Sequence, residues 1–142
     1  MSTVSSLLSR KGRTSITVSP DTSVVEALKL MAEKNIGSVI VMQGDQYLGI
    51  VTERDYSRKI ALKGKNSATT TVSEIMSSDL PSVSPADSIE HCMELMTTKN
   101  IRYMPVFENK NLAGIVSMSD VVKETILAQK ETIDQLQSYI QS

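Results

Sequence analysis

A seven-residue motif occurs twice in the chain and carries the residue types that could bind a ligand. Each copy, residues 49–55 (GIVTERD) and residues 114–120 (GIVSMSD), ends an apolar run with a hydroxyl residue and places an aspartate three positions later. If the hydroxyl residue caps a following helix, its oxygen and the first free backbone N–H groups could bind an anion or a polar ligand. The alternative needs no ligand, because this spacing resembles a capping box with Asp in place of Glu. Both interpretations remain open at this point.

The two copies differ in their basic residues. Arg54 and Arg58 lie at positions i and i+4 of the helix predicted after the first copy, and therefore on one face. Two guanidinium groups near a helix N-terminus could bind a phosphate through charge-assisted bonds; otherwise they form a solvated basic face. The second copy has Ser119 where the first has Arg54, but Arg102 stands just before its predicted hairpin.

The motif belongs to a longer internal repeat. From residue 18 to residue 120 the chain aligns with itself without a gap, at a shift of 65 residues. Residues 18–20 return as 83–85, and residues 34–36 return as 99–101. This agreement indicates duplication, and duplicated units commonly bury their apolar faces against each other.

Each repeat is predicted to contain a short strand, a helix, a hairpin and a second helix. The first strand is expected near residues 16–18 and 81–83. In the first repeat Ser23-x-x-Glu26 predicts a capping box, and the following stripe predicts an amphipathic helix. The stripe residues are Val24, Ala27, Leu28 and Met31 in the first repeat, and Ile89, Cys92, Met93 and Met96 in the second.

The helices and hairpins have sequence-predicted ends. Asn35 and Asn100 are expected to stop the first helix of each repeat, since Asn tolerates the left-handed conformation. Strand candidates at residues 38–42 and 47–51 flank a Gly44-Asp45 turn, and candidates at 103–107 and 112–116 flank residues 109–111, so both pairs are predicted as hairpins. Cys92 aligns with Ala27 and is interpreted as a small buried residue, whereas His91 falls off the stripe and is expected to face solvent.

The C-terminal segment is predicted to be one long helix. Ile126, Ile133 and Ile140 recur every seven residues, with Leu136 beside them, and no Pro or Gly interrupts the pattern from Ser119 onward. The helix could fold back on its own unit. We favour a homodimer seam, because four large aliphatic residues are more than one small unit is expected to cover.

The predicted organisation has five segments. They are an N-terminal arm or short helix at residues 1–14, the first repeat at 15–63, a linker at 64–79 that contains a brief helical turn at 72–76, the second repeat at 80–127, and a C-terminal helix extension at 128–142.

Composition and missing motifs exclude several classes of function. The chain has 15 Lys+Arg and 16 Asp+Glu residues, a net charge of -1, so no overall attraction to nucleic acid or to an acidic membrane is expected. One Cys permits no intrachain disulfide and fits a cytoplasmic location, and no apolar run is long enough to cross a bilayer. With a single His, and without a Walker loop or a G-x-G-x-x-G fingerprint, we expect no catalytic residues, no metal site and no enzyme activity.

The repeat, the order of strands and helices, and the Gly-h-h-Thr/Ser-x-x-Asp ending together resemble a tandem pair of CBS domains, a Bateman module, over residues 10–128. The chain is most similar to stand-alone proteins whose first copy ends in Glu-Arg-Asp-Tyr-x-Arg-Lys, here residues 53–59. The resemblance implies an α/β fold of the α+β type, with two β-α-β-β-α repeats packed about a pseudo-twofold axis and a long C-terminal helix.

The resemblance also implies two clefts between the repeats that bind adenine nucleotides such as AMP or ATP, and in some members NAD(H) or S-adenosylmethionine. The motif Asp would accept hydrogen bonds from ribose hydroxyls, and the Thr or Ser would contact ribose or phosphate. Carried over, one cleft would use Ile50, Thr52, Arg54, Asp55, Arg58, Val72, Ile75, Met76 and Arg102. The other would use Thr14, Ile16, Thr17, Ile36, Gly37, Ser38, Ile115, Ser117 and Asp120.

Two departures from the family predict unequal clefts. Gly37 stands where the family often has a basic residue, and Ser119 stands where the first repeat has Arg54. The Thr52 cleft is therefore expected to bind phosphate more tightly. The implied function is a regulatory sensor of adenosine nucleotides that needs no other cofactor, forms a homodimer and acts on an unknown protein partner. The alternative is a ligand-independent dimerisation or scaffold module with vestigial clefts.

Overall fold

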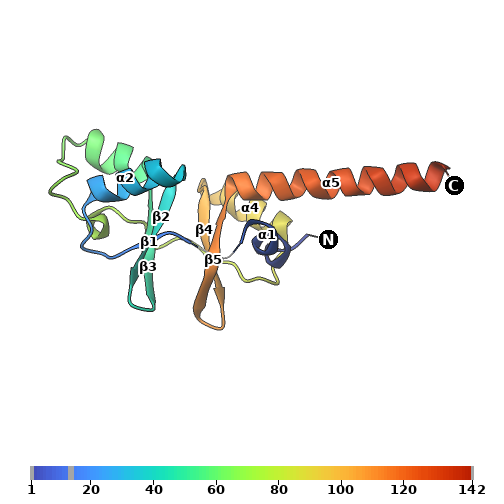
Figure 1. The fold of residues 1–142 in the computed structure, drawn as a ribbon, viewed down its shortest axis with the longest axis horizontal. Coiled ribbons are helices and arrows are strands. Elements are labelled where there is room, and N and C mark those ends of the chain that lie inside the picture. The colour runs from blue at the N-terminus through green and yellow to red at the C-terminus, as the bar shows by residue number, and fades with distance from the viewer. Residues whose placement is uncertain (1, 13–14, 142) are drawn as a thin grey trace. The chain divides into compact units, whose positions relative to one another are not determined.

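The structure is a computed structural model that describes residues 2–12 and 15–141. The chain forms two compact units, one of residues 15–80 and one of residues 1–14 together with 81–142 (Figure 1). We call them the first-repeat unit and the second-repeat unit. Each unit contains one copy of the seven-residue motif, at the end of its hairpin.

The first-repeat unit is a three-stranded sheet with helices. Its elements in chain order are β1 (Thr17–Val18), α2 (Val24–Lys34), β2 (Ser38–Gln43), β3 (Gln46–Thr52), α3 (Glu53–Tyr56), the π-helical turn η1 (Ser57–Ala61) and the 3-10 turn η2 (Val72–Glu74). The sheet order is β1-β2-β3, with β1 parallel to β2 and β2 antiparallel to β3. The predicted order of strand, helix, hairpin and helix is confirmed in this repeat.

Helix α2 begins and ends where its sequence predicts. The hydroxyl of Ser23 accepts a hydrogen bond from the backbone N–H of Glu26 at 3.3 Å, and Asn35 ends the helix in the left-handed region at φ 54°. Only this half of the predicted capping box forms, and the carboxylate of Glu26 pairs with Lys29 at 3.4 Å instead. Its stripe packs on the sheet, because burial of apolar side chains is the main force that holds such a layer together. The buried core of this unit comprises Val24, Ala27, Met31, Val39, Val41, Val51, Ile60, Val72 and Ile75.

The second-repeat unit repeats the helix and the hairpin. Its elements are α1 (Val4–Lys11), α4 (Ile89–Lys99), β4 (Tyr103–Glu108), β5 (Asn111–Ser117) and α5 (Met118–Gln141). Strands β4 and β5 are antiparallel, and Asn100 ends α4 at φ 54° as Asn35 ends α2. Cys92 is fully buried in this unit and His91 is exposed, as the stripe predicts.

The prediction of a strand at residues 81–83 is wrong, because the structure forms only an isolated parallel bridge there, between Val83 and Val106. The first repeat explains the difference. There the N–H of Ile40 donates to the carbonyl of Ile16 at 3.0 Å, but the residue at the position equivalent to Ile40 is Pro105. Proline has no N–H to donate, so the ladder cannot extend to Pro81.

Helix α1 is part of the core of the second-repeat unit. The N–H of Val4 donates to the carbonyl of Asp87 and that of Ser5 to the carbonyl of Pro85, both at 2.9 Å. Val4, Leu7 and Leu8 are buried in the same cluster as α4 and the hairpin. The segment expected as an arm or short helix is therefore a helix that completes the second repeat.

Helix α5 continues well beyond the part that packs on its unit. Val121 and Glu124 are buried, but every residue from 129 to 141 is exposed, and the helix runs without a break (Figure 1). The alternative that this segment folds back on its own unit is therefore wrong for the described residues. Among residues 2–12 and 15–141, no helix has the length and apolar character needed to span a membrane.

Candidate functional site: two strand-to-helix motifs

The first motif forms the turn from β3 into α3. The hydroxyl of Thr52 accepts a hydrogen bond from the N–H of Asp55 at 3.1 Å. In return, Asp55 Oδ2 accepts hydrogen bonds from the N–H and from the hydroxyl of Thr52, both at 3.0 Å. This reciprocal pair is a capping box, so the interpretation that needs no ligand accounts for both residues geometrically.

The other oxygen of Asp55 is also bound within the first-repeat unit. Lys59 Nζ lies 3.1 Å from Asp55 Oδ1, and the hydroxyl of Ser77 donates to the same oxygen at 3.2 Å. Lys59 Nζ additionally donates to the carbonyl of Ile75 at 2.8 Å. Asp55 is only 8% exposed, so its charge is compensated inside the unit by an ammonium group and hydrogen bonds.

The second motif has the same arrangement at the turn from β5 into α5. The N–H of Ser117 donates to Asp120 Oδ2 at 3.0 Å, and the N–H of Asp120 donates to the hydroxyl of Ser117 at 3.1 Å. Here the cation comes from α1, because Lys11 Nζ lies 2.6 Å from Asp120 Oδ2 and donates to the carbonyl of Ile115 at 3.0 Å. Burial by itself would raise the pKa of Asp120, but Lys11 and Ser117 outweigh it and hold that pKa below its usual range.

Each motif therefore contains an aspartate at the third position of a capping box. That aspartate is paired with a lysine that also donates to a backbone carbonyl. Sequence reasoning missed both lysines. Lys59 follows Asp55 by four residues on a helical segment, and that spacing could have identified it. Lys11 is 109 residues from Asp120, and no local pattern connects the two.

The backbone N–H groups at these helix starts are largely used. The N–H of Glu53 donates to the carbonyl of Gly37 at 3.2 Å, and the equivalent N–H of Met118 donates to the carbonyl of Arg102 at 2.8 Å. The third N–H of each helix is bound by the capping hydroxyl. Two of the first three donors thus have partners within their unit, so the backbone alone offers little to an anion.

The residues predicted for the two clefts fall in both units. The first-repeat unit holds Ile16, Thr17, Ile36, Gly37, Ser38, Ile50, Thr52, Arg54, Asp55, Arg58, Val72, Ile75 and Met76, and the second-repeat unit holds Arg102, Ile115, Ser117 and Asp120. Thr14 lies outside the described residues. Within the first-repeat unit, Val72 and Ile75 belong to the core and are 0% and 2% exposed, whereas Ile16, Ile36 and Met76 pack at its border.

The predicted basic residues are on the surface or near it. Arg58 and Arg102 are exposed, and Arg54 is half-buried. Arg54 lies in α3 and Arg58 in η1, because the helix widens at Ser57 from an α-helical to a π-helical turn. The regular i, i+4 face expected for these two residues is therefore interrupted, and π-helical turns are frequent at functional sites.

Metal-binding clusters are absent from the part of the chain that the structure describes. No group of three or more His, Cys, Asp or Glu side chains is positioned there to hold a metal ion. The chemistry that both motifs share is the pairing of a carboxylate with an ammonium group.

Comparison with known proteins identifies the family. The model of the CBS domain matches residues 5–62 and again residues 72–126, one match for each repeat. The sequence is 36% identical over 148 residues to the CBS domain-containing protein CBSX3, mitochondrial, of Arabidopsis thaliana, across 98% of this chain and 72% of that protein.

Two solved structures of CBS-domain proteins are similar to this chain in sequence and in fold. A putative signal-transduction protein with CBS domains from Burkholderia ambifaria has 44% sequence identity and a TM-score of 0.86, covering 90% of this chain and 96% of that one. A hexameric CBS-CP12 protein from bloom-forming cyanobacteria has 36% identity and a TM-score of 0.69, covering 78% of this chain and 65% of that one. Two β-α-β-β-α-like repeats with a long C-terminal helix define a tandem CBS pair. The chain belongs to the CBS-domain family.

Proposed function

We propose that this protein is a regulatory module that binds an adenine nucleotide, AMP, ATP or NAD(H), at its two motifs. The observation that carries the proposal is the pairing of opposite charges at both strand ends, Asp55 with Lys59 and Asp120 with Lys11. A carboxylate can accept hydrogen bonds from ribose hydroxyls, and an ammonium group can bind a phosphate. Membership of the CBS-domain family supports the same assignment.

The Thr52 motif is proposed as the tighter site. Arg54 and the exposed Arg58 follow it. In the second repeat Ser119 stands at the position of Arg54, Val122 at that of Ser57 and Lys123 at that of Arg58, so the second motif lacks one of the two cations. More positive charge near the motif favours a phosphate-bearing ligand. The nucleotide acts as a signal only if it binds two states of the protein with different affinity, and a downstream protein partner would recognise that difference.

We further propose that the protein is a cytoplasmic homodimer without enzyme activity. The relative from Burkholderia ambifaria, named as a putative signal-transduction protein, supports a regulatory role, and the hexameric CBS-CP12 protein is a related chain that self-associates. The single Cys is the basis of the proposed cytoplasmic location, and the missing catalytic motifs are the basis of the proposed lack of enzyme activity.

A ligand-independent scaffold is the second candidate. The capping boxes favour it, because Thr52, Asp55, Ser117 and Asp120 all have structural roles without a nucleotide. The two candidates differ in a simple way. A scaffold needs the motifs only for stability, whereas a sensor must bind the nucleotide.

A thermal-shift panel with AMP, ATP and NADH distinguishes them, since a ligand that binds only the folded state raises the melting temperature. We expect a rise of several degrees with at least one nucleotide at millimolar concentration. The Arg58→Ala variant should lose much of that rise, while Lys63→Ala, which removes another exposed cation from the same unit, should keep it. No rise with any of the three nucleotides would favour the scaffold.

A further inference from the structure

The exposed face of α5 carries a continuous heptad pattern. Steps of four and three residues connect Val122, Ile126, Gln129, Ile133, Leu136 and Ile140. The three isoleucines occupy the a positions, and Val122, Gln129 and Leu136 occupy the d positions. All six are exposed, and the aliphatic ones range from 43% for Val122 to 80% for Ile140.

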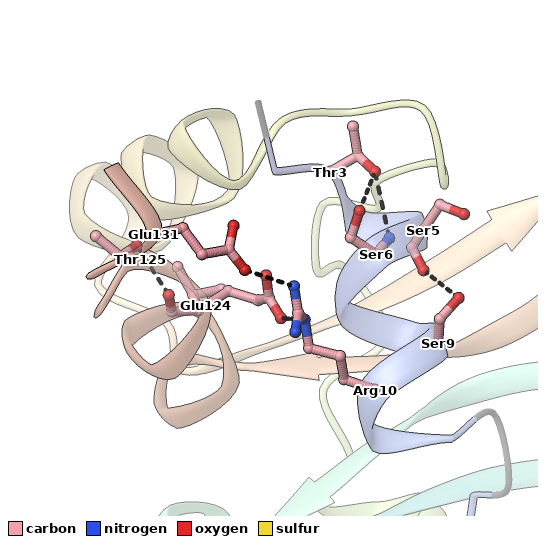
Figure 2. A network of polar contacts seen from close by, with 9 residues as sticks. Thr3, Ser5, Ser6, Ser9, Arg10, Glu124, Thr125 and Glu131 are labelled. Atoms are coloured by element: carbon pink, nitrogen blue, oxygen red, sulfur yellow. Dashed lines mark hydrogen bonds and ion pairs between the residues drawn. The ribbon is translucent and has the colours of Figure 1, made fainter. Parts of the chain in front are cut away.

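The second-repeat unit holds α5 by the opposite face. Arg10 of α1 forms ion pairs with Glu124 and Glu131 (Figure 2). Its Nε lies 2.6 Å from Glu124 Oε1, and its Nη2 lies 3.7 Å from Glu131 Oε1. Glu124 and Glu131 are f positions of the same heptads, on the side of the helix away from a and d. The contacts that fix α5 to its own unit therefore leave the apolar stripe uncovered.

The distal part of α5 is held to its own unit by the ion pair of Glu131 with Arg10 and is otherwise little packed. Residues 129–141 are all exposed, and the match to the CBS-domain family ends at residue 126. A helix of this length is marginal in water by itself, and this one contains the β-branched residues Thr132, Ile133 and Ile140. Its helical state calls for a partner that covers the stripe.

We propose that the partner is a second copy of this chain, and that the two α5 helices form a parallel two-stranded coiled coil over residues 122–140. Isoleucine at every a position, with a leucine at the d position Leu136, favours two strands in parallel. The proposal concerns residues outside the nucleotide motifs and does not depend on nucleotide binding.

Two polar residues favour the parallel orientation. Gln129 at a d position meets Gln129 of the second copy in a parallel pair, where the two amides can hydrogen-bond to each other. In the antiparallel pair that matches all a and d layers, Gln129 would instead face Ile133 and lose its partner. That arrangement would also bring Lys130, an e position, near Lys130 of the second copy, where like charges repel.

A groove beside the stripe supplies charge complementarity. It measures about 440 Å³ and lies between the first turn of α4 and α5. Its lining includes Glu90, Thr125 and Thr132, together with Gln129 and Ile133 at the edge of the stripe. Thr125 and Thr132 are g positions, and in a parallel coiled coil g positions flank the e positions of the other helix. Lys130 of the second copy is thus directed to the side of α5 where the exposed Glu90 lies.

Sedimentation equilibrium of the full chain without nucleotide tests the proposal. We expect a dimer, and we expect Ile133→Glu combined with Leu136→Glu to weaken it at least about 100-fold, because two central layers are lost. The matched control, Gln135→Glu combined with Ser138→Glu, adds the same charge at exposed positions off the stripe and should remain dimeric. A monomeric wild type, a trimer or tetramer, or a stripe variant as dimeric as the control would overturn the proposal.

Oxidative cross-linking tests the orientation. A Gln129→Cys variant should form a disulfide-linked dimer, since equivalent d positions face each other only in the parallel arrangement. Ser138→Cys, at an exposed f position, is the control and should not cross-link. Cys92 is fully buried and does not compete. A dimer that fails to cross-link through residue 129 would contradict the parallel pair.

Discussion

Lys11 and Asp120 form an ion pair of 2.6 Å that connects α1 to the motif of the second-repeat unit. The pair joins residues 109 positions apart in the sequence, and Lys11 also binds the carbonyl of Ile115 on β5. In the first-repeat unit Lys59 binds Asp55 and the carbonyl of Ile75 in the same manner. In both repeats a lysine thus binds the motif aspartate and a backbone carbonyl, but the two lysines come from unrelated positions in the sequence.

Replacing Lys11 by Met should lower the free energy of unfolding by roughly 0.5 to 1 kcal/mol, since a partly exposed pair contributes about that much. Urea unfolding at pH 7 measures the change. Lys29→Met is the control, because its pair with Glu26 is longer, at 3.4 Å, and both side chains are more exposed. We expect the control to be nearly neutral.

The same pair predicts a pH dependence. The pKa of Asp120 is lowered in the folded protein, so its contribution to stability is present above the pKa of the unfolded chain and disappears as the pH falls through the folded pKa. Between about pH 5 and pH 2, wild type should therefore lose more stability than Lys11→Met, in which that pKa is less depressed. Parallel curves for the two proteins would contradict this role of Lys11.

Replacing Asp55 by Ala should destabilise the protein by about 2 kcal/mol, because the change removes the N3 half of the capping box and leaves Lys59 without its carboxylate. Asp45→Ala removes an exposed carboxylate from the turn between β2 and β3 and serves as the control. Chemical denaturation of both variants gives the comparison. If Asp55→Ala were as stable as the control, the capping box would have no energetic importance.

The glycines that open the two motifs predict unequal tolerance to Ala. A Cβ at Gly49 would lie 2.8 Å from the backbone carbonyl oxygen of Ser77, whereas a Cβ at Gly114 would meet the side chain of Leu8 at 3.0 Å. A side chain can rotate more easily than a backbone can move. Gly49→Ala should therefore cost about 1 to 3 kcal/mol and Gly114→Ala less. Melting temperatures in the opposite order would refute this explanation.

Cys92 should be unreactive in the native protein. Burial raises the pKa of its thiol to about 11, and Asp87 adds to the effect, so almost no thiolate is present at neutral pH. Ellman's reagent at pH 8 should label the unfolded chain rapidly and the folded chain only as fast as it unfolds. Rapid labelling of the folded protein would show that Cys92 is accessible.

The sequence repeat predicted most of the local structure, because helix caps, stripes and hairpin turns act between neighbouring residues. As expected, α2 begins after Ser23 and ends at Asn35, and α4 ends at Asn100. The two strand-to-helix turns form at Thr52 and Ser117. The predicted strand at residues 81–83 failed through one substitution in its partner strand, Pro105.

The candidate site could be predicted only in part. The capped aspartates follow from the motif, but the contact of Lys11 with Asp120 depends on how α1 packs in the second-repeat unit, which no local pattern encodes. The change from α3 to the π-helical turn η1 likewise has no sequence signal that separates it from an ordinary helix. Long-range packing decides both features.

Nucleotide binding at the two motifs is tested most directly by an NMR titration of the ¹⁵N-labelled protein with AMP. We expect the largest shifts of backbone amide signals at Thr52, Asp55 and Arg58, with smaller ones at Ser117 and Asp120. A spectrum unchanged at millimolar AMP, ATP and NADH, or shifts confined to residues far from both motifs, would contradict the proposed function.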